Sequence, residues 1–109
     1  MMQQDLPVRF PDAVLERIAA EGMIYQCACP AQVAEKLLGI RAFFSYQRDC
    51  AGNGDALGVH GEIMRALAVA HAELETCLDR VLELEQWDRQ TWRMPEGLRK
   101  LRDDAMDLS

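Results

Sequence analysis

The sequence lacks any long apolar run. Half of its 109 residues are hydrophobic, but they alternate with charged residues, which make up 28% of the chain. No stretch approaches the ~20 consecutive apolar residues that a membrane-spanning helix requires. The first five residues also lack the basic and apolar regions of a secretory signal peptide. We therefore expect a cytoplasmic protein without a membrane partner, folded as a single helical domain over residues 1–109.

Basic residues are scarce as well. Twelve lysines and arginines stand against 18 aspartates and glutamates, which gives a formal net charge of −6. Proteins bind nucleic acids mainly by neutralising phosphates with positive side chains. The acidic balance therefore argues against a nucleic-acid partner.

Recognisable catalytic motifs are also missing. The chain contains no zinc-protease helix, no nucleophile elbow and no phosphate-binding loop in its required context. The run Ala51–Asp55 has the glycines of a phosphate loop, but helical patterns flank it where such a loop needs a preceding strand. We interpret this run as a turn, and we favour a non-enzymatic protein.

What the sequence does contain is helical periodicity. Apolar residues recur at steps of three and four over four stretches, at about 11–21, 30–49, 56–86 and 95–106. The fold class is therefore predicted as all-α. The second and third stretches would form an antiparallel helical hairpin, and the short N- and C-terminal helices would complete it into a three- or four-helix bundle.

The two long helices also suggest a register. The third carries an apolar stripe at heptad spacing, formed by His60, Ile63, Leu67, Ala70, Leu74, Cys77, Val81 and Leu84. Each helix rises ~1.5 Å per residue, so residues that face each other across a turn at Asn53 have numbers that add to about 107. This pairs Phe44 with Ile63 and Val33 with Leu74.

Three of the four cysteines meet in this register. Cys77 comes opposite Pro30, beside Cys29 and near Cys27, whereas Cys50 lies ~30 Å along the second helix. Cysteine ligands suit zinc, and a helix N-terminus favours the thiolate of a cysteine placed there. Cys27, Cys29 and Cys77 are therefore candidate metal ligands, with zinc as the candidate cofactor. A redox pair, a haem-responsive site at Cys29-Pro30 and inert buried thiols are the other interpretations.

A second candidate site follows the third helix. Trp87, Trp92 and Arg93 combine the residue types that contribute most energy at protein interfaces, so we predict that they bind a partner. The alternative is that this basic segment folds back and neutralises the acidic end of the third helix. His71 and Glu75, one helical turn apart, are interpreted as a surface pair.

Together these features predict a small helical interaction or regulatory module whose thiol cluster binds zinc or senses redox state. The third helix outreaches the second by ~15 Å. Either the first and last helices or a second copy of the chain would cover the apolar surface left over, and we expect a homodimer. Two alternatives stay open. One is a thiol-based redox enzyme with Cys29 as the nucleophile, and the other is a plain structural subunit with inert cysteines.

Overall fold

The computed structural model describes residues 6–22 and 29–97. Over these residues the chain forms three helices and no strand: α1 (Asp12–Gly22), α2 (Cys29–Ala51) and α3 (Val59–Leu84). The predicted all-α class is confirmed for this part of the chain. The predicted bounds of the three helices differ from the observed ones by at most three residues. The fourth predicted helix, at about 95–106, lies mostly outside the described residues.

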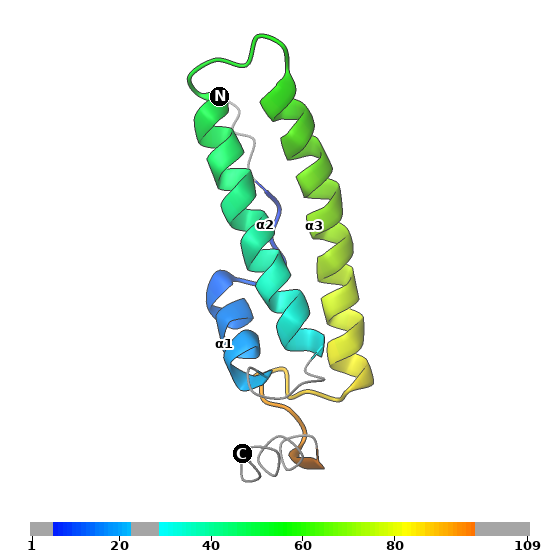
Figure 1. Ribbon diagram of the computed structural model, residues 1–109. Coiled ribbons are helices and arrows are strands. Elements are labelled where there is room, and N and C mark those ends of the chain that lie inside the picture. The colour runs from blue at the N-terminus through cyan, green and yellow to red at the C-terminus, as the bar shows by residue number, and fades with distance from the viewer. Residues whose placement is uncertain (1–5, 23–28, 98–109) are drawn as a thin grey trace, which may run out of the picture.

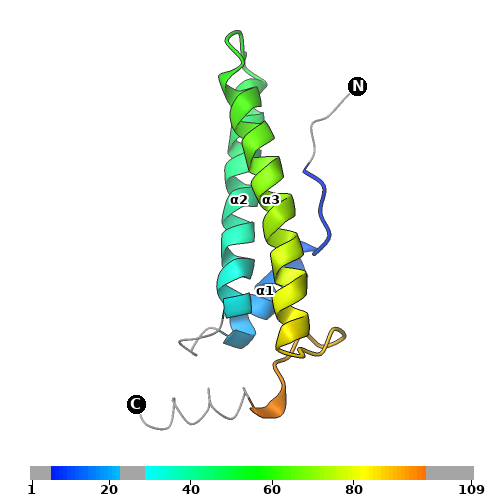
Figure 2. The ribbon, with the colours of Figure 1, turned by 90° about the vertical axis from the view of Figure 1, so that its right-hand side faces the viewer.

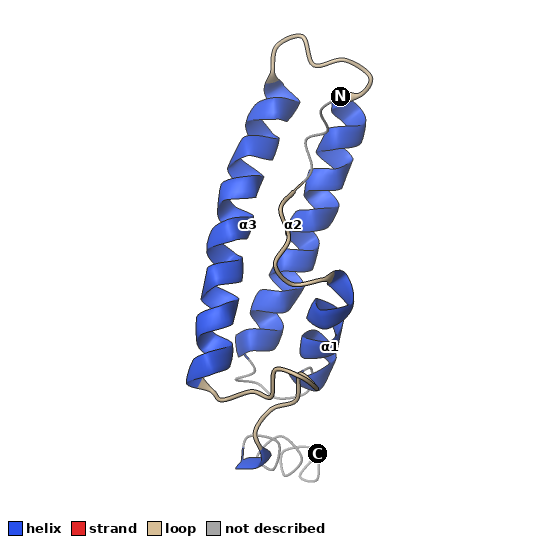
Figure 3. Ribbon diagram, turned by 180° about the vertical axis from the view of Figure 1, so that it is seen from behind, coloured by secondary structure: helices blue, strands red, loops and turns tan. Residues whose placement is uncertain are grey.

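α2 and α3 lie side by side and run in opposite directions, joined by residues 52–58, while α1 packs against α2 at the far end from that loop (Figure 1). Near the loop, Oε1 of Gln47 lies 2.7 Å from Nδ1 of His60, which links the two helices there. Residues 6–11 cross one broad side of the α2/α3 pair (Figure 3).

Asp55 fixes the start of α3. Its carboxylate accepts hydrogen bonds from the backbone N–H groups of His60, at 3.0 Å, and Gly61, at 2.9 Å, which are among the unpaired donors of the first helical turn. These bonds, that from His60 above all, lower the pKa of Asp55 below its ordinary value. Gly58 takes a left-handed conformation with φ of 74°, which only glycine adopts without strain.

The end of α3 is a Schellman turn. Gln86 has φ of 60°, the N–H of Trp87 donates to the carbonyl of Leu82 at 3.0 Å, and the N–H of Gln86 donates to the carbonyl of Glu83 at 3.1 Å. Leu82 and Trp87 are both buried, which supplies the apolar contact typical of this motif. The turn sends the chain back towards α1, where Glu21 accepts a hydrogen bond from the backbone N–H of Met94.

The core therefore lies at the α1 end of the molecule. Its buried residues come from α1, α2, α3 and the segments on either side of them: Phe10, Leu15, Ile18, Ala31, Ala34, Leu37, Leu78, Leu82, Trp87 and Met94. Each large aliphatic side chain buried there contributes about 1.5–3 kcal/mol. Towards the 52–58 loop the described chain is only two helices thick, and Phe44 and Met64 are the buried apolar residues between them.

The predicted apolar stripe of α3 is wrong by roughly a quarter turn of the helix. The buried residues of α3 are Met64, His71, Glu75, Leu78 and Leu82. Leu67 and Leu74, from the predicted stripe, are only half-buried, and Leu84 is 81% exposed. The helix is rotated because α1 and residues 6–11 pack on one side of the α2/α3 pair and draw the stripe of α3 that carries His71 and Glu75 into the interior.

Candidate functional site: a buried charge cluster and an open apolar face

A charged cluster is buried in the middle of the molecule. Arg41 of α2 meets His71 and Glu75 of α3, and the side chains of His71 and Glu75 are only 1% and 3% exposed. The interpretation of His71 and Glu75 as a surface pair is therefore wrong. Charged groups are expensive to bury unless they are paired and hydrogen-bonded, so the contacts of this cluster explain how it is tolerated.

The guanidinium of Arg41 supplies most of these contacts. Its Nε donates to Nε2 of His71 at 2.9 Å, its Nη2 to Oε2 of Glu75 at 3.0 Å, and its Nη1 to Oδ1 of Asp12 at 2.6 Å. Asp12 is the first residue of α1, where a carboxylate also interacts favourably with the helix dipole. One planar side chain on α2 thus links α1 to α3, a task for which the fixed donors of arginine are suited.

Glu75 also holds the segment that precedes α1. Besides Arg41, its Oε2 accepts hydrogen bonds from the backbone N–H groups of Arg9, at 2.8 Å, and Phe10, at 3.1 Å. Phe10 belongs to the core and contacts Trp92 edge to face, with ring centroids 6.0 Å apart. The carboxylate therefore sets where the chain enters α1 and where the aromatic side chain of Phe10 goes.

His71 is held in its neutral form. Because Nε2 accepts a hydrogen bond from Arg41, the proton of a neutral ring is assigned to Nδ1, which faces Oε1 of Glu75 at 3.7 Å, beyond hydrogen-bond distance. Burial lowers the pKa of His71, Glu75 opposes this effect, and the adjacent positive charge of Arg41 adds to it. The network is thus built around an uncharged imidazole.

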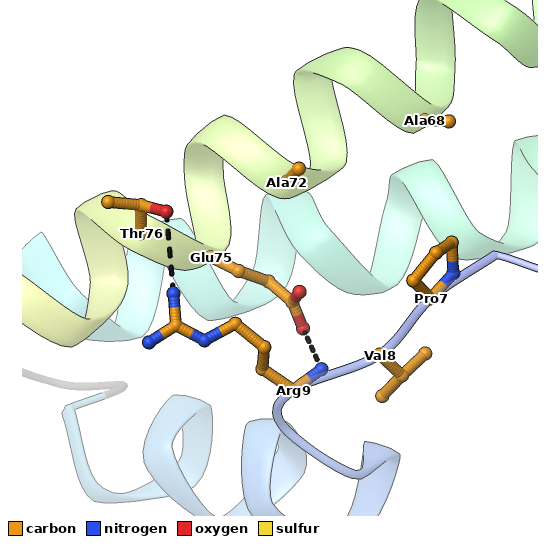
Figure 4. Close-up of a pocket in the computed structure, with 7 residues that line it drawn as sticks. All are labelled: Pro7, Val8, Arg9, Ala68, Ala72, Glu75 and Thr76. Carbon is orange, nitrogen blue, oxygen red and sulfur yellow. Dashed lines mark hydrogen bonds between the residues drawn. The ribbon is translucent and has the colours of Figure 1, made fainter.

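A pocket of about 280 Å³ borders the cluster (Figure 4). Residues 7–9 form one wall, Ala68, Ala72 and Thr76 form the other, and Glu75 lies at its edge. The polar groups in view are already bonded, since Arg9 donates to Thr76 and its backbone N–H to Glu75. The pocket is a seam between α3 and the N-terminal segment and has no catalytic set of side chains among its lining residues.

The structure places the predicted thiols only in part. Cys29 is the first residue of α2 and is exposed, Cys77 is half-buried on α3, and both are free. Cys27 lies outside the described residues, so the three-cysteine cluster stays a prediction. Within residues 6–22 and 29–97, no group of three or more histidine, cysteine, aspartate or glutamate side chains is arranged to hold a metal ion.

Two of the three predicted partner residues, Trp87 and Trp92, have intramolecular contacts. Trp87 is buried with 5% exposure, and its Nε1 donates to Glu85 at 2.9 Å. Trp92 is half-buried against the core, with the guanidinium of Arg89 5.8 Å from its ring centre. Arg93 is the one of the three predicted residues with an exposed side chain. Their binding of a partner stays a prediction.

An apolar surface is present elsewhere, on the side of the α2/α3 pair opposite residues 6–11. Ala68 and Ala72 of α3 face residues 7–9. A residue two positions further along a helix points roughly 200° away, so Ala70 and Leu74 point to the opposite side. In the same way, Arg41 contacts α1, so Phe43, two positions further along α2, points away from α1. We call this surface the open face and define it by eight apolar residues, none of them fully buried: Ile40, Phe43, Ile63, Leu67, Ala70, Leu74, Cys77 and Val81.

The views agree that the open face is uncovered by the described chain. In Figure 1 no other described element lies in front of α2 and α3, and in Figure 2 residues 6–11 lie on the opposite side of the pair. Phe43 is 47% exposed, and the half-buried Leu74 and Val81 pack against the core with one side only. The face combines apolar composition with access to a partner.

No protein-family model, curated protein or solved structure shows significant similarity to the chain. Among the described helices, none is both long and apolar enough to cross a membrane. The functional argument therefore depends on the geometry alone.

Sequence reasoning missed the charge cluster. His71 lies at heptad spacing between Met64 and Leu78, so it belongs to a second apolar stripe that the sequence also supports. Arg41 lies one turn after Leu37 on the packed side of α2, and its positive charge complements the carboxylate of Glu75. Together, these two features would have indicated a polar group inside the bundle.

The cluster predicts a large effect of Glu75→Ala on stability. The change leaves Nη2 of Arg41 and two backbone N–H groups without their acceptor, so we expect the free energy of unfolding to fall by about 3–5 kcal/mol. Urea unfolding followed by circular dichroism measures the loss. Glu73→Ala, at an exposed position on the same helix, is the control and should change stability by less than about 0.5 kcal/mol. Equal effects of the two variants would contradict the structural role of the cluster.

His71 predicts a pH dependence. Its pKa is lower in the folded than in the unfolded chain, so the unfolded state binds more protons between the two values. The contribution of the neutral His71 to the free energy of unfolding is complete above its unfolded pKa of about 6.5, and it is lost as the pH falls through its folded pKa. The urea concentration at which half of the protein is unfolded should therefore differ less between pH 7 and pH 5 in His71→Gln than in the unmodified protein. His60→Gln should keep the full difference, and a full difference in His71→Gln would refute the assignment.

Proposed function

We propose that this protein is a non-enzymatic interaction module that binds a helical partner through the open face of α2 and α3. The observation that carries the proposal is the row of accessible apolar side chains on a side that the described chain leaves uncovered. Scattered exposed apolar residues are ordinary on a protein surface, but an apolar stripe along α3 with Ile40 and Phe43 of α2 beside it indicates a binding site.

The spacing of the open face favours a helix as the partner. Its residues on α3 follow one another at alternating steps of four and three, from Ile63 to Val81. This is the spacing with which one helix packs along another. Charged residues are depleted at the centres of protein interfaces, and the α3 part of the open face contains none.

The proposal includes a specific arrangement of the helices. In it, α2 and α3 form an antiparallel hairpin, α1 adds a third helix, and a further helical layer on the open face completes a bundle. Completion of a bundle is a common way to bury the remaining apolar stripe of a helical pair.

The thiol cluster is a secondary proposal within this module. Cys29 begins α2 and Cys77 lies on the part of α3 that runs back to the same end of the molecule (Figure 1). With Cys27 these residues would supply three ligands of a zinc site, or two of them would form a reversible redox pair.

Photo-crosslinking in cells tests the main proposal. A photoreactive amino acid in place of Ala70, on the open face, should give a covalent adduct with a partner. The control is the same residue in place of Val69, which is 63% exposed but faces away from the open face. Adducts that form equally from both positions, or from neither, would sink the proposal.

Metal analysis tests the thiol proposal. Full-length protein purified without oxygen should contain about one zinc ion per chain, and Cys77→Ser should lose it because a structural zinc site needs its full set of ligands. Cys50→Ser should keep the metal, since Cys50 lies at the other end of α2. Metal-free protein would rule out the zinc site.

A further inference from the structure

We infer that the partner on the open face is a second copy of this chain, related to the first by a two-fold axis. The inference rests on the proposed function, because it names the occupant of the same face. Three observations favour a second copy over an unrelated helix or residues 98–109: the size of the face, its shape and the short length of residues 98–109.

The size of the face is sufficient for a dimer. On α3 it runs from Ile63 to Val81, so it is ~27 Å long, and two packed helices are ~20 Å wide. The projected area is therefore about 540 Å² on each copy, and two copies would together bury about 1,080 Å², above the ~1,000 Å² expected of a specific interface. A single docked helix would cover about half of this width and leave apolar surface exposed.

The shape of the face suits its own copy. It is a two-helix layer whose apolar residues come from both helices, Ile40 and Phe43 on α2 and the heptad-spaced set on α3. A two-fold axis places the same patch on both copies, so each layer of two helices would lie on another. Four packed helices are the usual solution to this arrangement.

Residues 98–109 are too few to cover the face as a helix. These twelve residues would span ~18 Å in helical form, about half the length of α3. An extended segment would reach further but would leave backbone groups without partners on an apolar surface. A second copy covers the whole length.

The charges near the face do not select a different partner. Glu62 is paired with Arg65 at 2.6 Å, so this carboxylate already has a partner within the chain, and the exposed Lys36 lies beside the face, one turn before Ile40 on α2. The open face itself is apolar along α3. Nothing in this pattern recruits a strongly basic or acidic molecule.

Light scattering of the purified full-length chain tests the inference. Between about 1 and 100 µM, a range that spans ordinary micromolar dissociation constants, the mass of the unmodified protein should rise to twice the 12.3 kDa mass of one chain. Ala70→Glu places a charge on the open face and should give the mass of one chain, with helical content retained. Val69→Glu, on the outer side of α3, should stay at twice the mass. If Ala70→Glu fails to fold, Phe43→Ser replaces it, because Phe43 is 47% exposed and its loss removes little packing.

The outcomes separate this inference from the proposed function. A single-chain mass at every concentration overturns the second copy, and the proposed function stands if position 70 still crosslinks to another protein in cells. Crosslinks from position 70 to residues 98–109 of the same chain overturn both. If Ala70→Glu still has twice the mass of one chain, the dimer contact lies outside the open face, and the inference is overturned.

Discussion

The arrangement of the helices depends on one interaction, the buried contact of the Arg41 guanidinium with the Glu75 carboxylate. These two groups contact or lie beside every described helix, because Arg41 bonds to Asp12 at the start of α1 and Glu75 holds the backbone at Arg9 and Phe10. A buried ion pair adds little net stability over an apolar pair of the same size, but loss of one partner is costly. The pair therefore selects one relative rotation and register of the helices above others that apolar packing alone would permit.

The same interaction explains why an apolar face is left open. α3 has two apolar stripes, one through Met64, Leu78 and Leu82 and one through Leu67, Leu74 and Val81. Only the first includes His71 and Glu75, so the contact with Arg41 turns this stripe inward. The second stripe moves to the flank, where it is half-buried. Burial of the charges and exposure of the open face are thus two results of one rotation.

The sequence predicts the elements of this fold better than their faces. Helix periodicity and the glycines at 52 and 54 locate α2, α3 and the loop between them, because these signals are local. Which stripe of α3 faces inward is not a local property, since it depends on Arg41 from another helix and on where residues 6–11 pack. The burial of Trp87 could not be predicted from its sequence neighbours either. Its sequence context among arginines indicates a surface, but the Schellman turn at Gln86 directs it into the core.

The position of Cys77 makes the two proposals interdependent. It is half-buried and belongs to the open face, one turn after Leu74 along the stripe. A second copy on that face would cover the Cys77 thiol, and a thiol becomes less reactive when an apolar surface surrounds it. Metal binding or oxidation at Cys77 would in turn place a charged or polar group at the edge of an apolar contact, which weakens it. Thiol chemistry and association would therefore oppose each other at this residue, so that a change in the state of one would shift the other.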